Sequence, residues 1–151
     1  MKIAFDTNIL AYAQGVNAGD RRTAATRAVA AVALEDTIIP VQALGELFNV
    51  LVLKAHWDRK EADAAVRRWQ QASQPVATSA EIMLQASSLA ARHQLRIWDA
   101  VVLAAAAEAR CNVLLSEDFQ DGFVWNGVTV CDPFRGTPHK LIADLLRLEE
   151  Q

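Results

Sequence analysis

Four carboxylates stand out because each follows, or lies within, a run of apolar residues. Asp6 follows "IAF", Asp99 follows "LRIW", Asp118 lies just past "NVLL", and Glu46 stands inside "ALGELFNVL". Carboxylates that converge on one place repel one another, and a divalent cation removes that repulsion. A ligand set made only of oxygen favours Mg²⁺ or Mn²⁺ over Zn²⁺. If they meet, the four acids predict a site for one or two such ions and displacement chemistry at phosphorus.

Each acid also has a structural interpretation. Asp6 and Asp99 stand where a helix would begin, and acids are favoured there as caps or first-turn residues. Asp118 suits a turn. Glu46 is harder to explain, because no Arg or Lys lies near it on its helix before Lys54, and an unpaired buried carboxylate is costly. For the three Asp residues both interpretations stay open, and Glu46 favours the metal site.

The elements that would position these acids alternate between strand and helix. The expected strands are 2–6, 37–40, 75–79, 112–116 and 128–131, and the expected helices are 20–35, 41–56, 59–73, 79–95, 98–110 and 138–149. Continuous apolar strand runs indicate an α/β fold with a central, mostly parallel sheet flanked by helices on both faces. Ligands of such sheets bind beyond the carboxyl ends of the strands, where Asp6 and Asp118 are expected.

Length and composition indicate one compact domain over residues 1–151. Apolar residues make up 52% of the chain and charged residues 22%, which argues against disorder. The start lacks the pattern of a signal peptide and no apolar run is long enough to cross a bilayer, so we expect a cytoplasmic protein without membrane contact.

Cys111 and Cys131 lie in apolar surroundings and are expected to be buried free thiols.

The formal net charge is −3, so any binding of nucleic acid must be local or bridged by cations. Three cations lie close to the acids in sequence, and they are candidates for contact with RNA phosphate: Lys54, Arg92 and Arg96. The alternative for each is a solvated surface cation. Trp69 and Trp98 are expected to belong to the core, since large aromatic residues in helices usually do.

The order of the acids, in "FDTN", "ALGELFNVL", "IWDA" and "LLSED", resembles the PIN-domain family and is most like the VapC-type toxin ribonucleases of bacterial toxin–antitoxin systems. The resemblance covers essentially the whole chain. It implies a Mg²⁺- or Mn²⁺-dependent endoribonuclease that hydrolyses RNA phosphodiester bonds. It also implies that the metal-binding and catalytic acids are Asp6, Glu46, Asp99 and Asp118.

Supporting residues are expected around these acids. The resemblance gives that role to Thr7, Asn8 and Ser116, with Asp121 as an extra acid that also suits a turn beside Gly122. Asn49 lies three residues after Glu46 on the same helical face, so we expect a hydrogen bond between the two side chains. As partners, the resemblance implies RNA as substrate, a cognate antitoxin that covers the acidic cleft, and a second copy in a homodimer.

Two other functions stay open. A housekeeping PIN-type nuclease of RNA processing, or one acting on DNA, would use the same chemistry with another partner. A phosphoacceptor signalling domain also gathers acids around Mg²⁺ at strand ends. Such a domain needs a Lys after a late strand, whereas the late strands here lead into "SED" and "DPF". That difference argues against the signalling function.

Overall fold

A six-stranded sheet forms the centre of the computed structural model, which describes residues 1–17 and 19–147. The strands are β1 (Ile3–Phe5), β2 (Thr37–Pro40), β3 (Gln74–Val76), β4 (Val113–Leu115), β5 (Val124–Trp125) and β6 (Val128–Cys131). Their order across the sheet is β3-β2-β1-β4-β6-β5, and all neighbours run parallel except β5 and β6. The predicted α/β fold with a mostly parallel sheet is confirmed.

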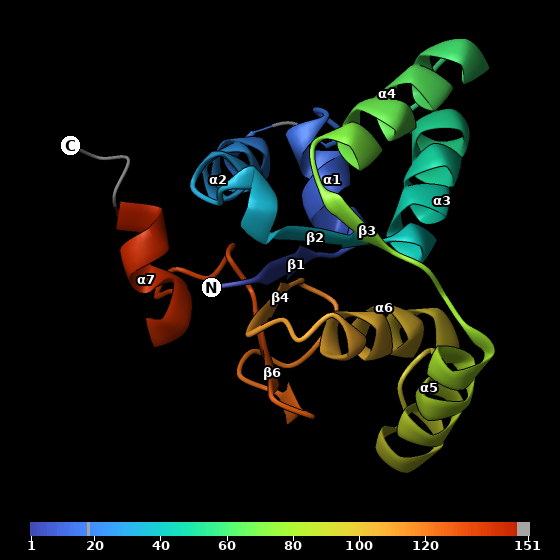
Figure 1. Cartoon of the computed structure of the whole chain (residues 1–151). Coiled ribbons are helices and arrows are strands. Elements are labelled where there is room, and N and C mark those ends of the chain that lie inside the picture. The colour runs from blue at the N-terminus through green and yellow to red at the C-terminus, as the bar shows by residue number, and fades with distance from the viewer. Residues whose placement is uncertain (18, 148–151) are drawn as a thin grey trace.

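Helices cover both faces of this sheet (Figure 1). They are α1 (Thr7–Ala13), α2 (Asp20–Ala30), α3 (Val41–Asn49), α4 (Arg59–Gln71), α5 (Ala80–His93), α6 (Ile97–Glu108) and α7 (Lys140–Arg147). The first four lie on one face, with α7 beyond α2, and α5 and α6 lie on the other. None of the described helices is long and apolar enough to cross a membrane.

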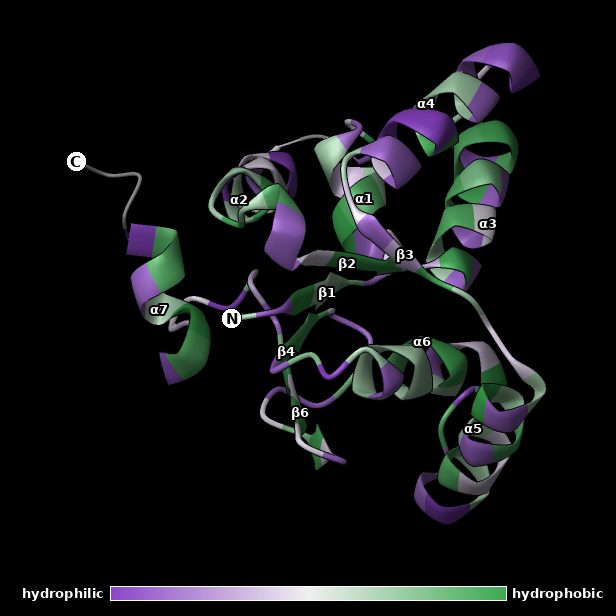
Figure 2. Ribbon diagram, in the orientation of Figure 1, coloured by the Kyte–Doolittle hydropathy of each residue, from purple (hydrophilic) through white to green (hydrophobic). Residues whose placement is uncertain are grey.

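Strand β1 contributes to two separate cores, because successive side chains of a strand point to opposite faces. Ile3 and Phe5 join the core shared with α1–α4, while Ala4 joins the core shared with α5 and α6. Figure 2 shows β1, β2 and β4 coloured mainly as hydrophobic, between helices that carry both apolar and polar residues. The sheet is therefore covered on both faces, which is why its strands read as continuous apolar runs.

The strand order changes direction beside β1. From β1 the chain adds β2 and β3 on one side, and from β4 it adds β6 and β5 on the other. The carboxyl ends of β1 and β4 are neighbours there, joined by a 3.1 Å hydrogen bond from the Asp6 amide to the Leu115 carbonyl. This switch point is where parallel α/β sheets open a crevice for ligands.

The helix expected over 41–56 changes geometry part way. Helix α3 ends at Asn49 and continues as a π-helical turn, η2 (Val50–Lys54), in which the Ala55 amide donates to the Val50 carbonyl at 3.1 Å. Turns of this kind are often found at functional sites. The helix expected over 20–35 ends instead at Ala30 and is followed by a 3₁₀ turn, η1 (Leu34–Asp36).

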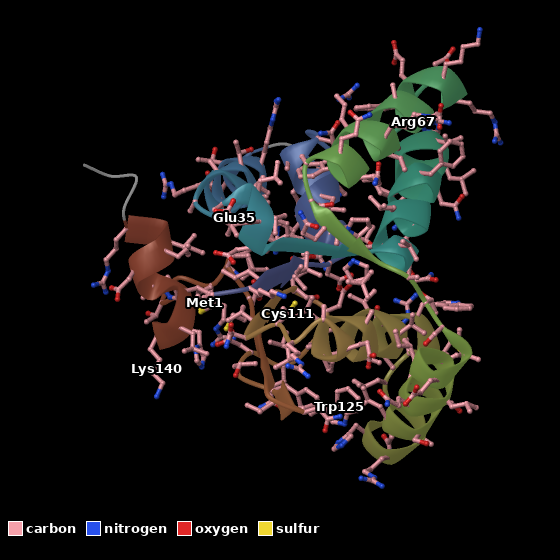
Figure 3. The ribbon with its side chains drawn as sticks, in the orientation of Figure 1. Met1, Glu35, Arg67, Cys111, Trp125 and Lys140 are labelled. Atoms are coloured by element: carbon pink, nitrogen blue, oxygen red, sulfur yellow. The ribbon has the colours of Figure 1, made fainter. Side chains whose placement is uncertain are left out.

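Strand β5 is an addition to the predicted elements. Asn126 and Gly127 have φ values of 45° and 82°, and they close a two-residue hairpin between Trp125 and Val128. The thiols behave as expected: Cys111, labelled in Figure 3 between α6 and β4, and Cys131 are both buried and free. Burial raises the pKa of each thiol to about 12.

Candidate active site

Three of the predicted acids meet at the switch point of the sheet. Asp6 follows β1, Asp118 follows β4, and Asp99 lies in the first turn of α6, and oxygen atoms of the three carboxylates lie within 4.8 Å of one another. Asp6 is buried, Asp99 is half-buried and Asp118 is exposed. The cluster therefore runs from the floor of the crevice to its mouth.

Asp6 caps a helix and also belongs to the acidic cluster. Its Oδ1 atom accepts a hydrogen bond of 2.7 Å from the Thr7 amide, so it caps α1, and its Oδ2 atom accepts one of 2.6 Å from the Ser116 hydroxyl. Burial raises the pKa of Asp6 to about 7, the two hydrogen bonds oppose that rise, and Asp118 and Asp99 add to it. The capping carboxylate is also a member of the acidic cluster.

Ser116 links the floor of the cluster to its mouth. Besides donating to Asp6, its hydroxyl oxygen accepts from the Asp118 amide at 3.1 Å and from the Asn8 amide group at 3.4 Å. Asn8 also donates to Oδ2 of Asp118 at 3.0 Å. The predicted supporting residues Asn8 and Ser116 thus touch the acids, and both fix the direction in which a carboxylate points.

Asp99 is held in a strongly acidic field. Burial raises its pKa to about 6, and Asp118 and Glu46 contribute to the rise while Arg96 opposes it. A protonated Asp99 gains an O–H donor and keeps part of its acceptor capacity, so its hydrogen bonding changes around pH 6. A positive charge that entered the cluster would favour the ionised form of Asp99.

Glu46 faces the same crevice but stands outside the three-Asp cluster. Its Oε2 atom accepts a 2.8 Å hydrogen bond from the Thr7 hydroxyl, and its Oε1 atom accepts one of 3.3 Å from Gln42. The expected hydrogen bond from Asn49 to Glu46 is not found among the described residues. Gln42, which lies one turn before Glu46 on α3, donates to Glu46 instead. Asn49 is exposed and lines the crevice instead. Thr7 therefore contacts Glu46 directly and fixes one of its two carboxylate oxygens.

The crevice is an open cavity of about 380 Å³, within the usual range of ligand sites. We call it the acidic cleft. The predicted residues that line it are Thr7, Asn8, Glu46, Asn49, Lys54, Arg96, Asp99 and Asp118. Asp6 and Ser116 form the buried layer that contacts these residues from below. The structure thus brings the four acids and most of their predicted neighbours to one place.

Two predicted residues do not belong to the cleft. Asp121 accepts a 2.8 Å hydrogen bond from the Asp132 amide and lies 3.7 Å from Arg135, so it ties together the loops around β6. Its expected place in the supporting shell is not supported. Arg92 is exposed in the last turn of α5 and does not line the cleft, whereas Lys54 and Arg96 do.

A network at the edge of the cleft was not expected from the sequence. Tyr12 donates a 2.5 Å hydrogen bond to Glu117, and Arg21 of α2 forms an ion pair with the same carboxylate. Arg21 also lies over the rings of Tyr12 and Phe134, with distances of 5.4 and 5.0 Å to the ring centres. Two sequence positions could have indicated this network: Glu117 directly precedes Asp118, and Tyr12 lies one helical turn after Asn8.

Trp98 contradicts its predicted place in the core. Its side chain is 48% exposed and lines the acidic cleft. The reason is its position in the first turn of α6, where the helix has not yet reached the core. The continuous buried stretch of this helix begins only at Ala100.

The donor set of the cleft suits a hard divalent cation. Its acids offer carboxylate oxygens alone, and neither His nor Cys is among the described residues that line it. Oxygen sets of this kind fit Mg²⁺ or Mn²⁺. Asp6, Asp99 and Asp118 would hold the ion directly. Burial, with a further contribution from the neighbouring acids, raises the pKa values of Asp6 and Asp99, and a bound cation would favour their ionised forms.

Comparison with known proteins places the chain among others of the same fold. A family model, the PIN domain, matches residues 3–120. No curated protein is significantly similar in sequence. A crystal structure of VapC20 from Mycobacterium tuberculosis, described as a Sarcin-Ricin loop cleaving toxin, is 21% identical with a TM-score of 0.68, over 82% of this chain and 97% of its own.

Two further structures agree in fold. A toxin–antitoxin complex from Klebsiella pneumoniae is 24% identical with a TM-score of 0.64, over 89% of this chain and 99% of that one. FitAcB from Neisseria gonorrhoeae is 18% identical with a TM-score of 0.63, over 88% and 99%. At these identities the likeness establishes the fold, and the chemistry must be argued from the cleft.

Proposed function

The chain belongs to the PIN-domain family, and from that premise we propose that it is a divalent-metal-dependent endoribonuclease that hydrolyses RNA phosphodiester bonds in its acidic cleft. The observation that carries the proposal is the convergence of Asp6, Asp99 and Asp118 within 4.8 Å at the switch point of the sheet. Like charges gathered this closely are stable only with a cation between them or with protons bound.

When bound, a divalent cation would lower the pKa of a water molecule and offset charge on the phosphoryl oxygens. The residues of the chain prepare that site. Asp6 is held by hydrogen bonds at both oxygens, so its direction is fixed before any ligand arrives. Asn8 orients Asp118, and Thr7 orients Glu46 at the far side of the cleft. Such neighbours commonly decide how well a metal site works.

Phosphate contact requires positive charge in a cleft that is otherwise acidic. Among the residues that line it, Lys54 and Arg96 are the basic ones. Both are exposed, and they come from different elements: Lys54 ends η2 and Arg96 stands at the start of α6. We assign them contacts with the RNA phosphates that flank the bond to be cut.

A role as the toxin of a toxin–antitoxin pair is part of the proposal. Its support is that similar structures are described as a toxin or as complexes of toxin and antitoxin. A cognate antitoxin would then cover the cleft, and a homodimer stays a prediction from the family resemblance. A housekeeping PIN-type nuclease would use the same cleft with another partner.

The proposal is tested with an RNA that carries a fluorophore and a quencher at its ends. The purified chain is incubated with Mg²⁺, with Mn²⁺ and with EDTA. We expect cleavage with at least one of the metals, none with EDTA, and products that carry 5′-phosphate ends. Cleavage of DNA alone would assign the other substrate, and cleavage that persists in EDTA would rule out the metal site.

A further inference from the structure

The four tryptophans of the chain divide into two groups. Trp57, Trp69 and Trp125 are partly buried and pack against one of the two cores. Trp98 belongs to neither core, and nearly half of its side chain is exposed. An exposed tryptophan leaves a large apolar area in contact with water. Packing within the chain therefore does not explain why a tryptophan stands at position 98.

Trp98 and Tyr12 are the aromatic residues that line the acidic cleft. Tyr12 is already engaged within the chain, because Arg21 lies over its ring, Phe134 meets it edge to face at 5.2 Å, and its hydroxyl is bound to Glu117. Among the described residues no aromatic ring and no cation stacks on Trp98. Trp98 is therefore the aromatic surface that the cleft leaves open.

The surroundings of Trp98 suit a nucleotide. It directly precedes Asp99 of the acidic cluster, and it shares the cleft wall with Arg96 and Lys54, the two basic residues there. An aromatic face flanked by cations is the combination that binds single-stranded nucleic acid, since bases stack on the ring while the cations hold the backbone.

We infer that Trp98 is the base-stacking residue of the acidic cleft and restricts cleavage to RNA whose bases are unpaired beside the bond to be cut. This inference rests on the proposed function. A base inside a duplex is already stacked on its neighbours, so it cannot reach Trp98 without being unstacked. Trp98 acts as a specificity-determining residue, while the acids carry the chemistry.

Binding is measured first, apart from catalysis. A short, labelled single-stranded RNA is titrated in EDTA into the Asp118→Asn protein, which keeps Trp98 and carries one negative charge fewer. In this background Trp98→Ala is expected to raise the Kd by roughly 5- to 100-fold, and Trp98→Phe by much less, because phenylalanine still stacks. RNA should quench the tryptophan fluorescence of the parent protein, and that quenching should be absent in Trp98→Phe although it binds.

Ile97→Ala is the matched control. Ile97 is the neighbouring exposed apolar residue, at 36% exposure, and it does not line the cleft. RNA binding should be unchanged in this variant. If Ile97→Ala and Trp98→Ala instead both change the molecular mass measured by light scattering, and neither changes RNA binding, then the exposed surface is a protein contact and the inference is wrong.

Cleavage then separates this inference from the proposed function. With Mg²⁺ or Mn²⁺, Trp98→Ala should raise KM for an unpaired RNA with little change in kcat, and should reduce the preference for unpaired over base-paired RNA. If wild type cleaves RNA but Trp98→Ala matches it in KM and preference, only the role of Trp98 fails. If wild type neither binds nor cleaves RNA, the proposed function fails and takes this inference with it.

Discussion

The hydroxyl of Ser116 donates a 2.6 Å hydrogen bond to Oδ2 of Asp6, joining residues 110 positions apart in the chain. Both residues are buried, and they follow the neighbouring strands β4 and β1. The bond fixes the direction of the deepest carboxylate of the acidic cleft. It also lowers the pKa of Asp6, which burial raises. Ser116 therefore fixes the direction of the Asp6 carboxylate and favours its ionised form.

Ser116→Ala should reduce cleavage and shift its pH dependence. Without this hydrogen bond the pKa of Asp6 rises further, so the acidic limb of the kcat/KM profile moves to higher pH. Loss of a supporting contact of this kind commonly reduces activity or metal affinity about 10- to 100-fold. Ser116→Thr, which keeps the hydroxyl, should retain most activity. An acidic limb that stays in place in Ser116→Ala would contradict this role.

Without metal, the stability of the chain should fall as pH rises. The pKa of Asp6 is about 7 in the folded chain against an ordinary value of 3.8, so the folded state binds this proton more tightly than the unfolded state. Its stabilising contribution is complete below about pH 4 and is lost as pH rises through about 7. Asp99, with a pKa of about 6, acts in the same direction.

Urea unfolding in EDTA at several pH values measures this effect. The loss between mildly acidic and mildly alkaline pH should be on the order of a few kcal/mol or less, and Asp6→Asn should reduce it. A wild-type protein whose free energy of unfolding rises over the same interval would contradict the account of Asp6.

Removing charge from the mouth of the acidic cleft should stabilise the metal-free chain. Asp99→Asn and Asp118→Asn each relieve repulsion, so both should raise the Tm in EDTA at alkaline pH. Added Mg²⁺ or Mn²⁺ should raise the Tm of wild type more than that of either variant. Asp63→Asn is the control, since Asp63 pairs with Arg67 on α4 away from the cleft. A lower Tm for both cleft variants would mean that these acids are structural.

Arg96→Ala should weaken RNA binding, whereas Arg92→Ala should not. The two arginines are four residues apart, but only Arg96 lines the acidic cleft. Loss of one phosphate contact should reduce the slope of log K against log salt by about 0.7 for single-stranded RNA. Arg96 also lowers the pKa of Asp99, so its removal should move the acidic limb of activity to higher pH. Equal effects of the two variants would contradict the assignment.

Much of this cleft was predictable because its residues carry local signals. Asp6 and Asp118 end buried strands, and parallel strands place their carboxyl ends at one edge of a sheet. Glu46 stood out as a charge in an apolar helix, and the structure places it at the cleft wall beside Thr7. Pattern and spacing thus led to the four acids without any knowledge of their contacts.

The remaining features depend on contacts between distant parts of the chain. Trp98 has the apolar character of a core residue, and only the packing of the start of α6 leaves it exposed. Asn49 lies on the expected face of α3, but Gln42 on the same face reaches Glu46 instead. Asp121 follows β4 closely in sequence, yet its carboxylate accepts a hydrogen bond from the Asp132 amide in the loop after β6. Sequence spacing carries no information about such competition.

Asp6→Asn is the substitution that removes the charge of the deepest carboxylate with the least other change. Asparagine keeps the size of the side chain and can still accept a hydrogen bond from the Thr7 amide at the start of α1. Single-turnover cleavage of the fluorogenic RNA should be compared for wild type, Asp6→Asn and Asp63→Asn, with Mg²⁺ and with Mn²⁺. We predict that Asp6→Asn is folded and loses cleavage by a factor of at least about 100, while Asp63→Asn cleaves like wild type. Equal cleavage by wild type and Asp6→Asn would contradict a role of Asp6 in the reaction.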